Sequence, residues 1–265
     1  MSSFLSRLAV VAVGLPVVLG LVHLGGWWLF GLAAGAAVLA LDELFRLTRA
    51  LQPVAIAGFV GGLLALLGAE ASGVGWMVGG FLAVIPVAFL LRGFVPGRSS
   101  VTVSIAITTL GALWVGVGIG YLLLIRALPE HGELATFTVL LAVFAGDSAA
   151  YLGGRLFGRH RMAPTVSPGK TWEGFVIGSA VCILVTWIAL YRTGFVDGWR
   201  SFVLGGALAV SSVLGDLFES SLKRDVGVKD SGRLLAGHGG MLDRIDALLF
   251  SGAVAYYVIV AFGAS

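Results

Sequence analysis

Charged residues are scarce in this sequence. Asp, Glu, Lys and Arg together make up 12% of the 265 residues, about half of the share in soluble domains, which is about 25%. Hydrophobic residues make up 58%. This balance excludes a soluble globular domain. It also excludes a nucleic-acid-binding fold, which needs a basic surface with aromatic residues among the cations. The chain is therefore expected to lie in a lipid bilayer.

Cysteine is nearly absent. The single cysteine, Cys182, lies inside an apolar run, so a disulfide within the chain is excluded, and no neighbouring base points to thiol catalysis. His23, His131 and His160 have no carboxylate or cysteine partner at the spacing of a zinc site. Both residue types are therefore expected to be structural, apart from His238, which lies in a polar segment considered below.

Long apolar runs dominate what is present. A membrane-spanning helix needs about 20 mostly apolar residues, and the first run is interpreted as an uncleaved span rather than a signal peptide. The sequence thus predicts an all-α, polytopic transmembrane bundle. The nine expected spans are 8–22, 25–41, 53–69, 73–91, 102–125, 134–154, 174–191, 201–221 and 243–262.

The basic residues predict the orientation of these spans. Nine spans place the termini on opposite sides, and Lys and Arg collect on the cytoplasmic side. With a cytoplasmic N-terminus, only Arg126, Arg192 and Arg200 of the 17 basic residues fall outside. The C-terminus is then expected outside. The positive net charge follows from this topology and would also attract anionic lipid headgroups.

Two parts of the chain are distinguished by their polar content. Residues 1–130 are expected to form an N-terminal group of spans 1–5. Residues 131–265 are expected to form a catalytic group of spans 6–9, with cytoplasmic loops 155–173 and 222–242. The abundant glycines in the apolar runs are interpreted as helix-packing positions. Residues 42–46, DELFR, are expected to form a solvated helix end.

The segment 220–246 concentrates the chemistry of the chain. Its cations suit phosphate oxygens, and Asp243 and Asp246, three residues apart, share one helical face and could hold a divalent cation. Two of the three lysines of the chain, Lys223 and Lys229, lie in this segment, and the third, Lys170, lies in the other polar loop. The pattern favours phosphoryl or nucleotidyl transfer.

Two further carboxylates lie within apolar spans, where a charge costs about 2.5 to 3.5 kcal/mol on insertion scales and tends to serve function. These are Asp147 and Asp216. Helical spacing places Asp216, Glu219 or Ser220, and Lys223 on one stripe. Structural alternatives remain: Asp147 pairs with a buried Ser or Arg, and Asp216 caps the helix or bridges to Lys223.

The loop 166–174, VSPGKTWEG, is the other polar loop and contains Lys170. Pro168 and Gly169 are expected to shape a turn, Lys170 supplies a point charge for phosphate, and Thr171 could cap the helix that follows. A P-loop is excluded because residue 164 is proline where that motif needs glycine.

The stretches VSPGKTWEGF and SSLKRDVGVKDSGRLLAGHGGMLDRID together resemble the bacterial phosphatidate cytidylyltransferase, or CDP-diacylglycerol synthase, family. The second matches the family signature from Ser220 to Asp246 without a gap. The resemblance implies transfer of CMP from CTP to phosphatidic acid in the cytoplasmic membrane, giving CDP-diacylglycerol and pyrophosphate. The partners implied are CTP, phosphatidic acid and membrane lipids. Oligomeric state stays open, with a homodimer among the states allowed.

The resemblance also implies roles for individual residues. One or two Mg²⁺ ions, with a monovalent cation as a further option, are expected at Asp216, Asp243 and Asp246. Catalytic roles are expected for Lys223, His238, Asp243 and Asp246; His238 would protonate the leaving group or bind phosphate. The residues expected to bind substrate are Asp147, Ser167, Lys170, Thr171, Glu173, Ser220, Arg224, Lys229, Asp230, Gly239, Gly240 and Arg244.

Two other functional classes stay open at this point. An ion-coupled transporter or lipid scramblase would use the buried carboxylates of the spans but leaves the phosphate-binding loops unexplained. A CTP-dependent kinase or cytidylyltransferase would keep the same chemistry and act on another lipid.

Overall fold

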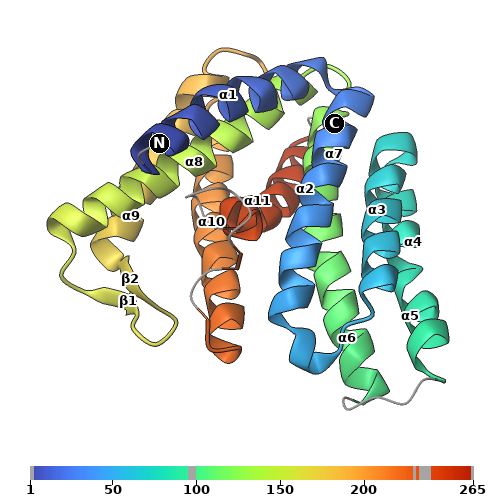
Figure 1. Ribbon diagram of the computed structural model, residues 1–265. Helices are drawn as coiled ribbons and strands as arrows, with labels where there is room; N and C mark the ends of the chain where they lie inside the picture. The colour runs from blue at the N-terminus through green and yellow to red at the C-terminus, as the bar shows by residue number, and fades with distance from the viewer. Residues whose placement is uncertain (1–2, 95–99, 229–230, 233–239, 264–265) are drawn as a thin grey trace. The chain divides into compact units, whose positions relative to one another are not determined.

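The computed structural model describes residues 3–94, 100–228, 231–232 and 240–263. Helices make up most of this part, which confirms the all-α class (Figure 1). Helices suit a bilayer because they satisfy every backbone hydrogen bond within one segment, where lipid offers no partners. Eight helical stretches of the described chain are long and apolar enough to cross a membrane. The chain is a multi-pass membrane protein.

These eight stretches coincide with the second to ninth expected spans. The first expected span falls within helix α1 (Ser3–Leu24), of which Gly14–Leu24 counts as a shorter apolar helix. The helix count is therefore close to the nine expected spans. The side of the membrane on which each terminus lies stays a prediction.

The chain forms two compact units, and the first comprises Met1–Ala127 and Val228–Ile245. Within it α3 is central, since it contacts α2, α4, α5, α6, η2 and α7. The elements of this unit before residue 128, besides α1, are α2 (Gly26–Leu47), η1 (Arg49–Leu51), α3 (Ala55–Ser72), α4 (Val74–Leu82), α5 (Val84–Arg92), α6 (Val101–Gly111), the π-helical η2 (Ala112–Val117) and α7 (Gly118–Arg126).

Local sequence explains the breaks between these helices. Gly25, with φ of 62°, separates α1 from α2, and Gly73, with φ of 85°, separates α3 from α4; these left-handed conformations favour glycine. Pro86 has no N–H to donate to the carbonyl of Leu82, which is the last residue of α4. The single expected span 73–91 is therefore two short helices in sequence.

Glycines of the first unit serve close helix packing, as the sequence predicted. A Cβ on Gly116 of η2 would lie 2.7 Å from the Cα of Gly62 in α3. A Cβ on Gly120 would lie 2.7 Å from the Sδ of Met77 in α4. Larger side chains at these positions would force the helices apart.

The second unit comprises Leu128–Gly227 and Asp246–Ser265. Its helix α9 packs against both α8 and α10, and a short hairpin contacts all three (Figure 1). Helix α11 begins with residues of the first unit and continues with residues of the second. The elements are α8 (Gly132–Phe157), β1 (Arg161–Ala163), β2 (Ser167–Thr171), α9 (Trp172–Leu190), α10 (Trp199–Asp225) and α11 (Leu242–Ala261).

Candidate functional site

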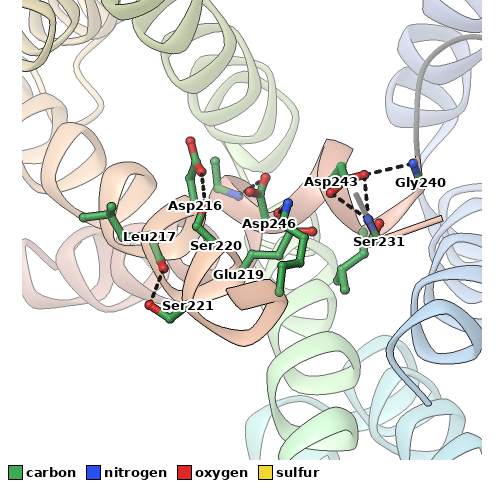
Figure 2. Close-up of polar contacts among 12 residues, drawn as sticks. Asp216, Leu217, Glu219, Ser220, Ser221, Ser231, Gly240, Asp243 and Asp246 are labelled. Atoms are coloured by element: carbon green, nitrogen blue, oxygen red, sulfur yellow. Dashed lines mark hydrogen bonds and ion pairs between the residues drawn. The ribbon is translucent and has the colours of Figure 1, made fainter. Parts of the chain in front are cut away.

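Helix α10 positions most of the polar residues of the second unit. It begins after Gly198, which has φ of 60°, and ends before Gly227, which has φ of 73°. Lys223 and Arg224 lie in its last turn, where cations interact favourably with the carbonyl end of the helix dipole. The expected stripe is present in part: the Ser220 hydroxyl donates to Asp216 Oδ1 at 3.4 Å (Figure 2).

The loop that contains Lys170 meets helix α10. Lys170 Nζ lies 2.8 Å from Asp216 Oδ2 and donates to the carbonyl of Val213 at 3.4 Å. The Lys170 side chain is 20% exposed and that of Asp216 is 43% exposed. Asp216 therefore forms an ion pair with Lys170. The structural roles considered from the sequence were a helix cap or a salt bridge from Asp216 to Lys223, and they did not include Lys170.

A second contact joins the same two segments. The Arg224 Nε–H donates to the carbonyl of Val166 at 3.1 Å. The Lys170 loop is thus held against α10 at Asp216 and again at Arg224, and the second contact joins it to the signature segment. Lys170 and Arg224 therefore lie on segments that contact each other, and their substrate-binding roles stay predictions.

Lys223 pairs with Glu219 in the same helix. Its Nζ lies 3.0 Å from Glu219 Oε2, and the two side chains are 13% and 2% exposed. Asp246 of α11 interacts electrostatically with both Glu219 and Lys223. The sequence analysis named Glu219 only as an alternative to Ser220 on the helical stripe. Helical spacing does not predict that Glu219 is buried, because its burial depends on how the helices pack.

Asp147 of α8 belongs to the same electrostatic neighbourhood. It interacts with the charges of Asp216, Asp246 and Lys170, so the acidic residues expected within spans of the second unit do gather. A small hollow of about 10 Å³ lies beside it, lined also by Ser179, Cys182 and Ser212. A cavity of this volume holds about one water molecule, so this hollow is too small for a nucleotide.

Helix packing brings Asp246 close to α10. A Cβ on Gly215 would lie 2.5 Å from the carbonyl oxygen of Asp246. The ring centroids of Phe218 and Phe250 are 5.6 Å apart, and Ser211 donates to Ser251 at 3.2 Å. The residue before Asp216 is glycine because the backbone of α11 occupies the space of a side chain.

The hairpin corrects one expectation and confirms another. Pro168 and Gly169 lie within β2, and the turn is at 164–166, so the expected turn was placed too late. The Pro168 carbonyl accepts a hydrogen bond from the Arg161 side chain, and a proline is tolerated on the edge of so small a sheet. Thr171 does cap α9, because its Oγ1 accepts from Gly174 N at 3.1 Å.

The other loop residues expected to bind substrate have protein partners. Ser167 pairs with Ala163 across the hairpin. Glu173 lies 2.6 Å from His160 Nδ1 and accepts from the backbone amides of Arg159 and His160. Their substrate-binding roles stay predictions.

In the first unit, Asp243 accepts hydrogen bonds from backbone amides. Its Oδ2 accepts from Gly240 N at 3.0 Å and from Ser231 N at 3.2 Å (Figure 2). The neighbouring Arg244 N–H donates to the carbonyl of Met241 at 3.0 Å. Asp243 lies in the first turn of α11, one turn before Asp246, as the spacing predicted.

Glu43 corrects the expectation for residues 42–46. Asp42 and Arg46 are exposed enough to fit it and form an ion pair at 2.9 Å, but Glu43 is only 3% exposed. It accepts hydrogen bonds from Ser231, Met241 and Leu242. Nothing in the local DELFR pattern marks this contact, because its partners are almost 200 residues away in the chain.

Several predicted site residues lie outside the described residues. These are Lys229, Asp230, His238 and Gly239, together with Arg233 and Gly237 of the same signature. Among the residues that the structure does describe, no group of three His, Cys, Asp or Glu side chains has a geometry that would hold a metal ion. The oxygen donors of Asp216, Asp243 and Asp246 nevertheless fit a hard divalent cation in their chemistry.

Comparison with known proteins identifies the family of this chain. The sequence model of the cytidylyltransferase family matches residues 5–262. A phosphatidate cytidylyltransferase of Mycobacterium bovis is 34% identical over 266 residues, which cover 94% of this chain and 85% of that protein. One of Staphylococcus haemolyticus is 32% identical over 250 residues, covering 92% and 94%.

A shorter match has a higher identity. A phosphatidate cytidylyltransferase of Haemophilus influenzae is 45% identical over 125 residues, which cover 45% of this chain and 43% of that protein. With a family match over almost its whole length and two polar motifs in contact, the chain belongs to the cytidylyltransferase family.

Proposed function

We propose that this chain transfers CMP from CTP to phosphatidic acid, giving CDP-diacylglycerol and pyrophosphate. The observation that carries the proposal is the ion pair between Lys170 and Asp216 at 2.8 Å, which joins the Lys170 loop to helix α10 in a membrane protein of this family. The names of its relatives support phosphatidate as the acceptor.

The reaction needs little acid–base chemistry from the protein. A phosphate monoester has a second pKa of about 6, so phosphatidate is mostly ionised near neutral pH and its oxygen can attack the α-phosphorus of CTP directly. A bond forms between this oxygen and the α-phosphorus, and the bond from that phosphorus to the bridging oxygen breaks. Pyrophosphate leaves with the electron pair. Binding, orientation and charge stabilisation are then the main tasks of the site.

The cations of the second unit suit these tasks. Lys170, Lys223 and Arg224 have carboxylate or carbonyl partners, and substrate phosphates would compete for the same N–H groups. Lys170 is the simplest to redirect, because its partner Asp216 is 43% exposed and is readily solvated. Lys223 is held by a buried carboxylate and would approach a phosphate with a fixed geometry.

We keep Mg²⁺ as part of the proposal, with Asp216, Asp243 and Asp246 as the residues that would hold it. A divalent cation there supplies charge neutralisation on the triphosphate and on departing pyrophosphate. Asp216 would be among the residues that hold the ion, and Lys170 would then be available to bind phosphate.

The site is proposed to face the cytoplasm at the surface of the cytoplasmic membrane. The distribution of basic residues supports this orientation, and CTP is supplied on that side. Phosphatidate would enter from the bilayer with its headgroup at the level of the Lys170 hairpin.

The test is turnover of the purified, detergent-solubilised chain with labelled CTP, Mg²⁺ and phosphatidate. CDP-diacylglycerol and pyrophosphate should form in equal amounts, whereas release of CDP would indicate a kinase. Asp243→Asn should lower turnover at least about 100-fold. The exposed Asp225 provides the control Asp225→Asn, which should retain activity. Folded wild-type protein that forms neither product would refute the proposal.

A further inference from the structure

One buried carboxylate of the first unit has a role that the family reaction does not explain. Glu43 lies in the membrane-spanning helix α2 and is 3% exposed. An ionisable residue inside a span is costly and calls for a function. Its neighbour Asp42 instead pairs with Arg46 at 2.9 Å and is one-third exposed.

The partners of Glu43 come from the signature segment. Its Oε1 accepts from the Met241 N–H at 2.9 Å, and its Oε2 accepts from the Leu242 N–H at 2.9 Å. The Ser231 hydroxyl donates to Oε2 at 3.2 Å. Leu242 is the first residue of α11, so Glu43 occupies the N-terminus of this helix, where free amides and the helix dipole favour a negative charge.

Two glycines allow this approach. A Cβ on Gly232 would lie 2.7 Å from Glu43 Oε1, and a Cβ on Gly240 would lie 2.5 Å from Glu43 Oε2. A side chain at either position would therefore displace the carboxylate. Gly232 and Gly240 therefore serve this contact.

The same segment is tied to Asp243. Ser231 donates through its hydroxyl to Glu43 and through its backbone amide to Asp243. The Gly240 amide donates to Asp243 Oδ2 at 3.0 Å, and the next two amides donate to Glu43. Consecutive amides are therefore divided between the two carboxylates, and a shift of Glu43 would move the partners of Asp243.

We propose that Glu43 is a positioning residue that fixes the first turn of α11, and with it Asp243, in the orientation that cytidylyl transfer requires. The inference rests on the proposed function for its kinetic consequence but not for its structural one. It also gives the N-terminal spans, which lie outside the signature, a direct part in forming the site.

The test compares Glu43→Gln and Ser231→Ala with the matched control Asp42→Asn. Glu43→Gln keeps the size of the side chain but replaces one acceptor oxygen by an amide donor. Deuterium uptake by the backbone amides of 240–246 should rise in Glu43→Gln and, by less, in Ser231→Ala. The control should match wild type. This measurement does not depend on activity, so it tests the contact even if the wild-type chain transfers no CMP.

Kinetics then separate positioning from general stability. Per folded molecule, Glu43→Gln should lose about 10-fold to 100-fold in kcat, the range seen when a partner of a functional ligand is removed, with a smaller change in KM for CTP. Unchanged deuterium uptake in Glu43→Gln would overturn the proposal. So would raised uptake with unchanged kcat, because the residue would then support only the fold. Ser231→Ala removes one donor of three and keeps the test available if Glu43→Gln does not fold.

Discussion

Two carboxylate clusters in this molecule differ in the kind of partner they use. In the second unit, Asp216 and Glu219 pair with the side chains of Lys170 and Lys223. In the first unit, Glu43 and Asp243 accept mainly from backbone amides of the signature segment. The carboxylates of one cluster are bound by long cationic side chains, and those of the other are bound mainly by backbone amides.

This difference in hydrogen-bond donors suits one cluster to substrate binding and the other to positioning. A lysine can turn from a carboxylate to a substrate phosphate by rotating its own side chain, whereas a backbone amide moves only with its loop. The second-unit cluster is therefore suited to exchange partners during turnover. The first-unit cluster is suited to stay fixed, since leaving several buried amides unsatisfied would cost about 1 to 3 kcal/mol for each.

The largest expected effect comes from Lys223→Ala. Removing one partner of a buried pair costs about 3 to 5 kcal/mol because the other charge is left uncompensated, and Glu219 is 2% exposed. The variant should unfold at lower temperature and lose turnover.

The double variant Glu219→Gln with Lys223→Met should recover most of the stability but not the turnover. Thermal unfolding in detergent and CDP-diacylglycerol formation measure the two effects. Recovery of both would show that Lys223 only balances Glu219.

Gly215→Ala tests whether α10 and α11 must stay in close contact beside Asp246. The new Cβ would lie 2.5 Å from the Asp246 carbonyl, and overpacking of this kind costs about 1 to 3 kcal/mol. Thermal unfolding and turnover should both fall. Gly206 of the same helix has no atom within 4 Å of its would-be Cβ, so Gly206→Ala should be neutral or stabilise by up to about 1 kcal/mol. Equal effects of the two substitutions would contradict the packing argument.

Lys170→Ala should separate substrate binding from stability most clearly. Its partner Asp216 is 43% exposed, so the loss of the pair should cost at most about 1 kcal/mol. The KM for CTP or phosphatidate should rise about tenfold or more, the value of one charge-assisted hydrogen bond. Steady-state kinetics with each substrate varied in turn measure this. Unchanged KM for both would remove Lys170 from the site, and Lys170→Arg is the charge-retaining control.

Glu173→Gln should have the smallest effect. Glu173 holds His160 and two backbone amides at the start of the hairpin, and His160 is 77% exposed, where ion pairs contribute little. Both KM values should change less than about fivefold. A change as large as that of Lys170→Ala would show that Glu173 binds substrate itself, as the sequence led us to expect.

Much of the local structure followed from short-range sequence. The apolar runs predicted the spans because their length matches the bilayer. Thr171 predicted the start of α9 because a threonine before a helix caps its amides. The predicted position of the hairpin turn was wrong. Pro168 and Gly169 favour a turn locally, but hydrogen bonds across the hairpin place them in β2.

The sequence by itself determined the multi-pass membrane character, the helical class and the family. These depend on composition, on helical periodicity and on a contiguous signature. Tertiary structure alone decided the long-range partners: Lys170 with Asp216, and Glu43 with residues near Asp243. Such pairings join segments that are distant in the chain, and the choice among several available carboxylates depends on which helix faces are packed together.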